Sequence, residues 1–264
     1  MNDPLPGRPT LCVGVLSMNE ARRIAACLES AAFADQLLVV DSGSTDDTCA
    51  IARACGAEVH LHPQWKGFAE QRNRLLGHVR TDYVFFLDAD EEIPAGLREE
   101  IQQAAATGLP VRGEVRWEQV AYGRVLRAMT STGGIERMFR ANTLVRFEGV
   151  VHEGPVFTTP GIPVRRFRHR LLHRSRETVY ESLLKLAQYV QLGAAKRHAL
   201  GRSGGLARGF ASGTAIFVRL YLFRCGFLCG PEGFLFCFFI ALECFFRQAA
   251  LKYDRGLLGE TSIR

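Results

Sequence analysis

Residues 83–90 read Y-V-F-F-L-D-A-D, and this segment is the strongest indication of the fold. It starts with aromatic and aliphatic residues and stops at two carboxylates, Asp88 and Asp90, which are separated by a single alanine. A short apolar run of this kind is typical of a strand buried on both faces of a parallel sheet. Asp88 and Asp90 would then lie at the carboxyl end of that strand, where open α/β sheets bind their ligands.

The two carboxylates indicate a metal site. Neighbouring carboxylates repel each other unless a cation compensates them, and hard oxygen ligands suit Mg²⁺ or Mn²⁺. A divalent cation bound there could hold a diphosphate. The alternative is an acidic loop that leads into a helix, because Pro94 suits a first helical position and acidic side chains favour that end of a helix. The spacing of the two aspartates does not by itself separate these interpretations.

Three apolar segments upstream are predicted strands, at residues 11–16, 36–40 and 57–61, and a helical pattern follows each of them. This alternation predicts an α/β fold with a mainly parallel sheet flanked by helices. The first helix is expected to begin near Asn19, and the second to end at Gly56, a suitable C′ glycine. Asp46 and Asp47 suit a helix start, which leaves Asp41 at the end of its strand unexplained.

Three motifs in order along the chain carry a resemblance to a known family: V-V-D-S-G-S-T-D-D-T (39–48), K-G-F-A-E-Q-R-N (66–73) and F-L-D-A-D (86–90). They resemble the nucleotide-binding half of family 2 glycosyltransferases with the Rossmann-like GT-A fold. The segments R-F-E-G-V-V-H-E-G (146–154) and G-F-L-C-G-P-E-G-F (226–234) are similar to the bacterial subfamily that includes lipopolysaccharide core β-1,4-glucosyltransferases. The resemblance implies a catalytic domain at 1–175, with a nucleotide-sugar half at 1–92 and an acceptor half at 93–175, and a helical extension at 176–264.

The resemblance also implies a nucleotide-sugar site. Asp41 is expected to bind the uracil or ribose of a UDP-sugar. Ser17, Asn19 and Glu20, after the first strand, are expected to line the same pocket. Arg72 is expected to lie over the base or the phosphates, although an arginine on a helix is more commonly just solvated.

The metal and the reaction involve the later motifs. By resemblance, Asp88 contacts the ribose and holds Mg²⁺ or Mn²⁺ with Asp90, and His173 is a further candidate ligand. A sugar hydroxyl needs a base to take its proton, and Glu153 is the candidate for an inverting transfer. If the stretch around residue 150 is a strand, Glu148 faces the opposite way from Glu153, so only one of them can point into a cleft. The alternative for Glu153 is a surface acid in a glycine-bounded turn.

Charge and composition bear on the binding partners. The net charge is +6, and only four of the 33 basic residues are lysine. Basic residues concentrate between Arg165 and Arg208. Nucleic acid is one explanation for such a run, but anionic lipid head groups or a phosphorylated lipid-linked acceptor fit better with the apolar segment that follows. Arg137 and Arg140 alternate with apolar residues as in a half-buried strand, so one of them could reach a phosphate.

The C-terminal part predicts contact with a membrane. An amphipathic helix is expected at 178–197, a break at 201–209, and apolar segments at 216–223 and 227–246. Pro231 and Glu232 interrupt the last of these, which favours an interfacial or re-entrant hairpin over a clean span. The alternative is a hydrophobic face buried in a homo-oligomer. The eight cysteines show no disulfide framework and no signal peptide is evident, which together predict the cytoplasmic face of the bacterial inner membrane.

The sequence therefore predicts an inverting, metal-dependent transferase that moves one sugar, with glucose the first choice, from a UDP-sugar to a cell-envelope glycan or glycolipid such as lipopolysaccharide core. Transfer of a single sugar fits the absence of a Q-x-x-R-W motif, which the processive enzymes of the family carry. Three alternatives remain. A P-loop or dinucleotide enzyme is disfavoured, because neither G-x-x-x-x-G-K-S/T nor G-x-G-x-x-G is present. A sugar nucleotidyltransferase would need a glycine-rich basic loop near the N terminus, and a noncatalytic carbohydrate- or nucleotide-sugar-binding protein at the membrane would need neither Asp90 nor Glu153.

Overall fold

The computed structural model describes residues 7–149 and 154–258. It has two compact units. The N-terminal unit comprises Met1–Trp117 and Thr132–His173, and the C-terminal unit comprises Glu118–Ser131 and Arg174–Arg264. The division of the chain after residue 175 stays a prediction, and the two units differ from it chiefly by grouping Glu118–Ser131 with the C-terminal helices.

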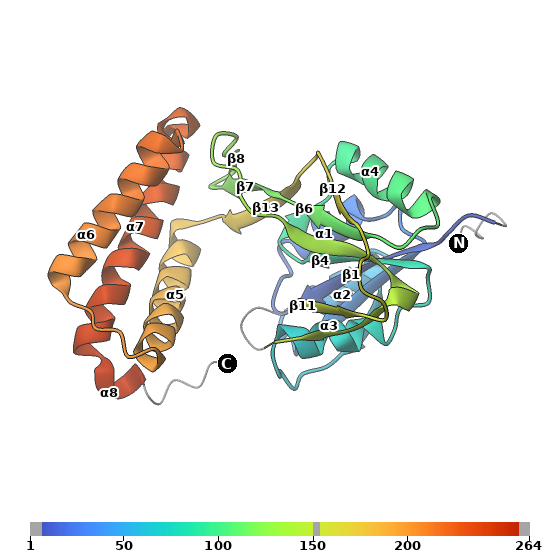
Figure 1. Ribbon diagram of the computed structural model, residues 1–264, viewed down its shortest axis with the longest axis horizontal. Helices are drawn as coiled ribbons and strands as arrows, with labels where there is room; N and C mark the ends of the chain where they lie inside the picture. The colour runs from blue at the N-terminus through green and yellow to red at the C-terminus, as the bar shows by residue number, and fades with distance from the viewer. Residues whose placement is uncertain (1–6, 150–153, 259–264) are drawn as a thin grey trace. The chain divides into compact units, whose positions relative to one another are not determined.

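The N-terminal unit is built on a seven-stranded sheet (Figure 1). Its neighbours pair in parallel except for β9, which runs antiparallel to both β4 and β6. The predicted α/β fold with a mainly parallel sheet is therefore confirmed. In order across the sheet, the strands are β12 (Val164–Arg166), β6 (Arg112–Val115), β9 (Ile135–Arg140), β4 (Tyr83–Asp88), β1 (Leu11–Ser17), β2 (Gln36–Asp41) and β3 (Glu58–Leu61).

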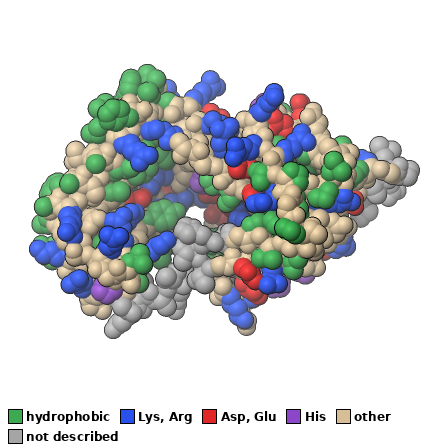
Figure 2. All heavy atoms as spheres, viewed as in Figure 1, with side chains coloured by type: hydrophobic (Ala, Val, Ile, Leu, Met, Phe, Trp, Pro, Cys, Tyr) green, Lys and Arg blue, Asp and Glu red, His purple; other side chains and the backbone are tan. Residues whose placement is uncertain are grey.

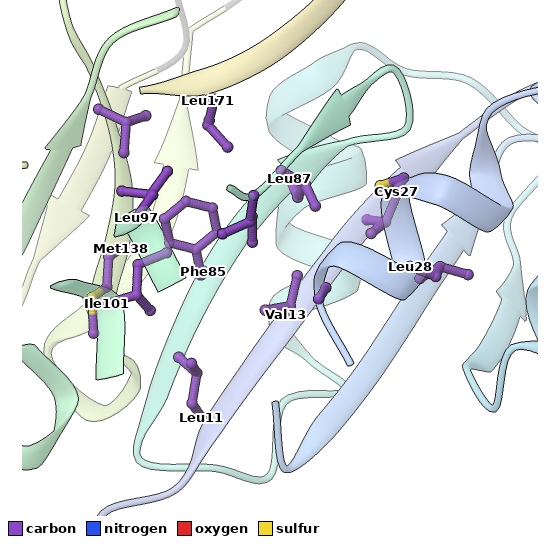
Figure 3. Packing of buried hydrophobic residues seen from close by; sticks show 14 of the residues in the cluster. Leu11, Val13, Cys27, Leu28, Phe85, Leu87, Leu97, Ile101, Met138 and Leu171 are labelled. Carbon is purple, nitrogen blue, oxygen red and sulfur yellow. The ribbon is translucent and has the colours of Figure 1, made fainter. Parts of the chain in front are cut away.

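Helices cover both faces of this sheet, which explains why β4 is apolar without interruption. Alternate side chains of β4 enter two separate cores. Phe85 and Leu87 pack in the core that includes residues of α1 (Ile24–Ser30) and α4 (Ala95–Ala106), and Figure 3 shows them near Leu97 and Leu171. Val84 and Phe86 pack in the other core with Leu75 of α3 (Phe68–Leu76). The remaining elements of this unit are α2 (Thr48–Ala54), β5 (Glu91–Glu92), the 3₁₀ turn η1 (Ala141–Thr143), β10 (Leu144–Glu148) and β11 (Gly154–Phe157).

Two local expectations need correction. The first helix begins at Ile24 and not near Asn19, because Asn19 adopts a left-handed backbone conformation with φ of 57° that a helix cannot continue. Glu91 and Glu92 form a short strand that pairs with β13 (Leu171–Arg176), so the acidic segment after Asp88 is not simply a loop and a helix start. Pro94 does precede α4 directly.

The C-terminal unit is mainly helical. Helix α5 (Val179–Ala199) begins where the Thr178 hydroxyl accepts a hydrogen bond from the Glu181 N–H at 3.0 Å. The chain break ends at Gly205, earlier than expected, because α6 (Leu206–Val218) already includes Gly209. A π-helical segment η2 (Arg219–Phe223) and a 3₁₀ turn η3 (Gly226–Cys229) connect α6 to α7 (Gly230–Tyr253). The other elements are β7 (Trp117–Ala121), β8 (Arg124–Val125) and α8 (Arg255–Leu258).

Helix α7 is the long apolar element of this unit. Pro231 lies in its first turn, so this residue starts the helix and does not interrupt it. The helical stretch Gly226–Tyr253 is long and apolar enough to cross a membrane by length and composition. It nevertheless packs against both α5 and α6. Length and composition alone therefore do not distinguish a membrane segment from a core helix here.

Candidate active site

The candidate site begins with Asp41, at the carboxyl end of β2. Its carboxylate is fully buried and accepts hydrogen bonds from the Ser17 hydroxyl at 2.8 Å, the Ser44 hydroxyl at 2.5 Å and the N–H groups of Gly43 and Ser44 at 3.0 and 2.7 Å. Burial alone would raise the pKa of Asp41, but these hydrogen bonds outweigh it and lower that pKa. Asp41 is therefore an ionised group in a fixed orientation, and it shapes the loop after β2.

The loop after β1 is tied to the loop after β2. The Asn19 side chain accepts a hydrogen bond from the Thr45 N–H at 2.8 Å, and the Asn19 N–H donates to the Ser44 hydroxyl at 2.8 Å. The Glu20 N–H donates to the Thr48 hydroxyl at 2.8 Å. Ser17, Asn19, Glu20 and Asp41 are thus brought together at one edge of the sheet. The short polar side chains of the motif at 39–48 are used mainly to build this edge.

Helix α3 carries the Q-R-N segment, and each of its three side chains is held. Gln71 donates to the Ser42 hydroxyl at 3.0 Å and to the His62 carbonyl at 3.1 Å. Arg72 is only 5% exposed, so the solvated-arginine interpretation is wrong. Its guanidinium lies 5.5 Å from the centre of the Phe147 ring and 3.8 Å from the Asp88 carboxylate.

Asn73 connects α3 to the hairpin of β10 and β11. Its side chain donates to the Phe147 carbonyl at 3.0 Å and accepts from the Phe147 N–H at 2.7 Å. Glu148 pairs with Gly154 across this hairpin. The strand that leads toward Glu153 is therefore fixed to the helix that carries Arg72.

Asp88 ends β4 and belongs to a buried network of charges. The Arg137 guanidinium of β9 donates to both Asp88 carboxylate oxygens, at 3.2 and 2.5 Å, and to Glu91 at 2.9 Å. Glu91 also accepts from the Trp117 indole at 2.5 Å and from the Asp88 N–H at 3.0 Å. Arg137 and Glu91 are each 1% exposed. The Arg137 guanidinium thus compensates part of the negative charge of Asp88 and Glu91 without a metal ion.

This network shifts the pKa values of its members in opposite directions. Burial would raise the pKa of Asp88, but the Arg137 charge and hydrogen bonds, with help from Arg72, lower it to about 2. Burial raises the pKa of Glu91 more than Arg137 lowers it. Burial would lower the pKa of Arg137, yet the two carboxylates raise it, so this arginine stays charged. Asp88 is the ionised carboxylate of the site, and about a third of its side chain is open to solvent.

Asp90 and His173 form a second pair. The His173 imidazole Nε2 lies 3.3 Å from an Asp90 carboxylate oxygen, because β13 pairs with β5 and places His173 opposite Glu91. Burial would lower the pKa of His173, but hydrogen bonding to Asp90 and the nearby acids raise it. Both side chains are partly exposed, at 21% and 28%. A position 83 residues further along the chain is thus brought to the D-A-D motif.

The donor set of this pair fits one side of a divalent metal site. A carboxylate oxygen and an imidazole nitrogen both suit Mn²⁺, and Mg²⁺ commonly takes few protein ligands together with phosphate oxygens and water. Within residues 7–149 and 154–258, no group of three or more His, Cys, Asp or Glu side chains could hold a metal ion. Both Asp88 oxygens already accept from Arg137, so Asp90 and His173 are the better ligands.

Glu153 lies outside the described residues. The competing acid, Glu148, is described and is 55% exposed, and its carboxylate forms an ion pair with Arg146 at 2.5 Å. A surface ion pair of this kind is not the environment of a general base. Glu148 is therefore explained without a role in the reaction.

Sequence reasoning missed several residues that build the site. The sequence does not indicate the roles of Glu91, Gln71 and Asn73 in the site. Arg137 contacts two carboxylates, whereas its place in a half-buried strand suggested a phosphate. Arg140 donates to the Gly108 carbonyl. The available signal is Arg137 next to the apolar Met138 and Phe139 in the segment I-E-R-M-F-R, since a buried arginine requires a buried acid nearby.

Comparison with known sequences identifies the family. Residues 12–153, more than half of the chain, match the sequence model described as glycosyl transferase family 2. The chain belongs to this family. It therefore has a role in glycosyl transfer, and the resemblance in the motifs at 39–48, 66–73 and 86–90 is confirmed at the level of the family.

Individual relatives of this glycosyltransferase differ in how much they share. The lipopolysaccharide core biosynthesis glycosyltransferase LpsC of Rhizobium meliloti (strain 1021) is 26% identical over 250 residues, which cover 89% of this chain and 92% of LpsC. An uncharacterized glycosyltransferase of Rickettsia felis is 39% identical over 94 residues, and the match spans only 33% of that relative. A crystal structure of Mycobacterium tuberculosis glucosyl-3-phosphoglycerate synthase with Mn²⁺, UDP-glucose and phosphoglyceric acid is 30% identical over 40% of this chain and 43% of that chain, with a TM-score of 0.35.

Proposed function

We propose that this family 2 glycosyltransferase is a metal-dependent inverting enzyme that transfers one sugar, glucose first, from a UDP-sugar to a hydroxyl of a cell-envelope glycolipid such as lipopolysaccharide core. One observation carries the proposal. Asp90 and His173 face each other beside the Asp88–Arg137 ion pair, at the same sheet edge as Asp41. Carboxylates at the carboxyl ends of parallel strands, with an imidazole and a buried arginine beside them, suit a metal–diphosphate group.

The residues of the nucleotide site take distinct roles in this proposal. Asp41 binds the uracil or ribose, in a pocket bordered by Ser17, Asn19 and Glu20. Asp88 binds the ribose with the oxygen surface that Arg137 leaves open. Arg72 lies over the base or the phosphates, because its guanidinium is already stacked on Phe147 and cannot turn toward bulk water.

Asp90 and His173 would hold Mg²⁺ or Mn²⁺, and the bound cation neutralises charge on the departing diphosphate. Glu153 would accept the proton of the acceptor hydroxyl. Two observations favour Glu153 over Glu148. Glu153 is the second acid of the motif R-F-E-G-V-V-H-E-G, and Glu148 forms an ion pair with Arg146 on the surface. Attack from the face opposite the leaving UDP needs one base and no covalent intermediate, so a single carboxylate is sufficient.

The acceptor and the location follow from sequence similarity. LpsC, which shares most of its length with this chain, is described as an enzyme of lipopolysaccharide core biosynthesis. A core glycolipid under construction is anchored in a membrane, so we place the enzyme at the cytoplasmic face of the inner membrane. The absence of a Q-x-x-R-W motif supports the transfer of a single sugar.

A donor screen tests the proposal. Purified full-length protein is incubated with one nucleotide sugar at a time, a truncated lipopolysaccharide core as acceptor, and Mn²⁺ or Mg²⁺. Nucleotide release is measured before and after a chelator is added. UDP release that requires UDP-glucose and stops with chelator is expected. Activity undiminished by chelator would remove the metal from the mechanism, and no release from any nucleotide sugar would favour a binding protein.

The base is tested with a matched pair of variants. Glu153→Gln should lower turnover by about 10²–10⁴-fold, the usual contribution of a general base, with little change in UDP binding. Glu148→Gln is the control, because this acid lies five residues earlier and is engaged on the surface by Arg146. Equal activity of the two variants would exclude Glu153 as the base.

A further inference from the structure

Glycines of α6 allow its backbone to approach α7 closely, and phenylalanines pack beside them. Gly205, Gly209 and Gly213 recur at every fourth position, so they share one face of the helix. A Cβ atom at Gly209 or Gly213 would lie 3.0 Å from a carbonyl oxygen of α7. The Gly205 N–H donates to the Gln248 carbonyl at 2.8 Å. Close helix packing through small residues is typical of proteins in lipid, because it does not depend on burying large apolar side chains.

Several large apolar side chains of α6 and α7 are consequently left exposed. A groove of about 560 Å³ between α6 and α7 is lined almost entirely by apolar residues, and several of them are well exposed. Phe210 is 66% exposed, and Phe238 and Phe246 are 42% and 43% exposed. A monomeric soluble protein rarely leaves such a continuous apolar patch open to water.

The end of the hairpin is also apolar. Leu222 and Phe223 of η2 are 54% and 79% exposed, and Phe227 and Leu228 of η3 are 48% and 64% exposed. Figure 2 shows hydrophobic side chains gathered at this end, where α6 is connected to α7, and basic side chains toward the opposite end of the helices. The connecting end is therefore mainly apolar, although η2 also carries the exposed Arg219, and the opposite end is basic.

The basic end contains a pocket of about 670 Å³, lined by Arg197, Arg202, Arg208, Ser203 and Gln248 among others. Arg208 donates to the carbonyl and the hydroxyl of Ser203, at 2.8 and 2.6 Å. In the described part of the chain, the side chains of Arg197 and Arg202 have no hydrogen-bond or ion-pair partner. Three guanidinium groups around one pocket suit a phosphate group.

The pocket and the groove are adjacent along both helices. Arg208 of the pocket directly precedes Gly209 and Phe210 of the groove, and Gln248 of the pocket follows Phe246 of the groove by two residues. An amphiphile with a phosphate head group and an apolar tail could place its head in the pocket and its tail along the groove. Neither surface alone would distinguish a lipid from a soluble phosphate or an apolar peptide.

Charge separates a lipid surface from a second copy of the chain. Residues 174–258 contain twelve arginines and lysines but only five aspartates and glutamates. Two of these acids, Glu232 and Glu243, are already paired with Arg124 and Arg176 in the same unit. Two copies placed face to face would bring like charges together, whereas anionic head groups would compensate them.

We propose that the outer face of α6 and α7 docks on an anionic phospholipid bilayer, with the phenylalanines in the acyl region and a lipid phosphate in the arginine-lined pocket. The hairpin lies at the interface and does not span the bilayer, because α5 covers one side of α7. The binding is separate from glycosyl transfer, since it involves only residues of the C-terminal unit.

Vesicle flotation of the full-length protein without nucleotide sugar tests this proposal. Wild-type protein should partition to vesicles that contain phosphatidylglycerol and weakly to pure phosphatidylcholine. The double variant Arg197→Gln/Arg202→Gln should lower partitioning roughly 30-fold, because each basic residue near an anionic surface contributes about a factor of five. The variant Phe210→Ser/Phe238→Ser should lower it further and leave only salt-sensitive binding.

Matched controls and a second readout keep the test decisive. Arg98→Gln and Leu109→Ser change an exposed arginine and an exposed leucine of the N-terminal unit, and both should bind vesicles like wild type. Arg202→Lys should retain most of the binding, and far-UV circular dichroism should show unchanged helix content in every variant. Equal binding to neutral and anionic vesicles would overturn docking on an anionic bilayer, because phosphatidylcholine carries a phosphate but no net charge. A dimer in sedimentation that Phe210→Ser/Phe238→Ser converts to a monomer, without vesicle binding, would overturn the proposal in favour of a second copy.

Discussion

Replacing Arg137 by methionine tests the buried network most directly. Methionine keeps much of the length of arginine but removes the charge and the fork of donors. It leaves Asp88 and Glu91 without their main partner. Because Glu91 is only 1% exposed, water cannot replace that partner. Removing one member of a buried ion pair costs about 3–5 kcal/mol, because the remaining charge stays out of water. Arg112→Met is the matched control on neighbouring β6, since the Arg112–Glu136 pair is partly exposed and should contribute about 0–1 kcal/mol.

Urea unfolding followed by tryptophan fluorescence measures this difference. Both tryptophans, Trp65 and Trp117, belong to the N-terminal unit, so the signal reports on the unit that contains Arg137. With a dependence of about 2 kcal/mol per molar urea, Arg137→Met should lower the unfolding midpoint by roughly 1.5–2.5 M. The control should lower it by no more than about 0.5 M.

A double variant checks the cause. Arg137→Met/Glu91→Gln removes the uncompensated charge while Trp117 keeps an amide oxygen as acceptor, so it should be more stable than Arg137→Met alone. If Arg137→Met shifts the midpoint no further than Arg112→Met, the network does not carry the energy assigned to it. If the double variant shows no recovery, loss of packing and not the buried charge is the cause.

Three further predictions concern other parts of the chain. Hydrogen bonding from Arg80 lowers the pKa of Glu58 from 4.5 to about 2, so the stability difference between wild type and Glu58→Gln should be full above pH 4.5 and vanish as the pH falls through 2; a constant difference down to pH 2 contradicts this. Gly213→Val should destabilise the C-terminal unit by about 1–3 kcal/mol in thermal melts through its contact with α7, whereas Gly256→Ala, with open space around it, should be neutral or slightly stabilising. Asn73→Ala should raise protease cleavage within β10 and β11 and lower turnover, because it leaves the backbone groups of Phe147 without partners; unchanged cleavage would show that α3 does not hold the hairpin.

The sequence specified the α/β fold because its signals are local. A strand that is buried on both faces is apolar at every position, as Y-V-F-F-L is. The spacing of apolar residues along the chain predicts the alternation of strands and helices. The carboxyl ends of parallel strands share one edge of a sheet, so the sequence is sufficient to predict that Ser17, Asp41 and Asp88 lie close together. The start of α1 could not, because the left-handed conformation of Asn19 depends on hydrogen bonds to the loop after β2.

The family motifs gave the residues of the site but not their partners. The residue order alone predicts that Asp88 ends β4, that Asp90 follows two residues later, and that His173 and Arg137 lie far downstream. The pairing of Arg137 with Asp88 and Glu91, and of His173 with Asp90, appears only in the folded chain. These pairs form through the antiparallel strand β9 and the pairing of β13 with β5, which join residues about 50 to 80 positions apart. Side-chain charge can be read from a sequence, but which opposite charge compensates it depends on long-range strand register.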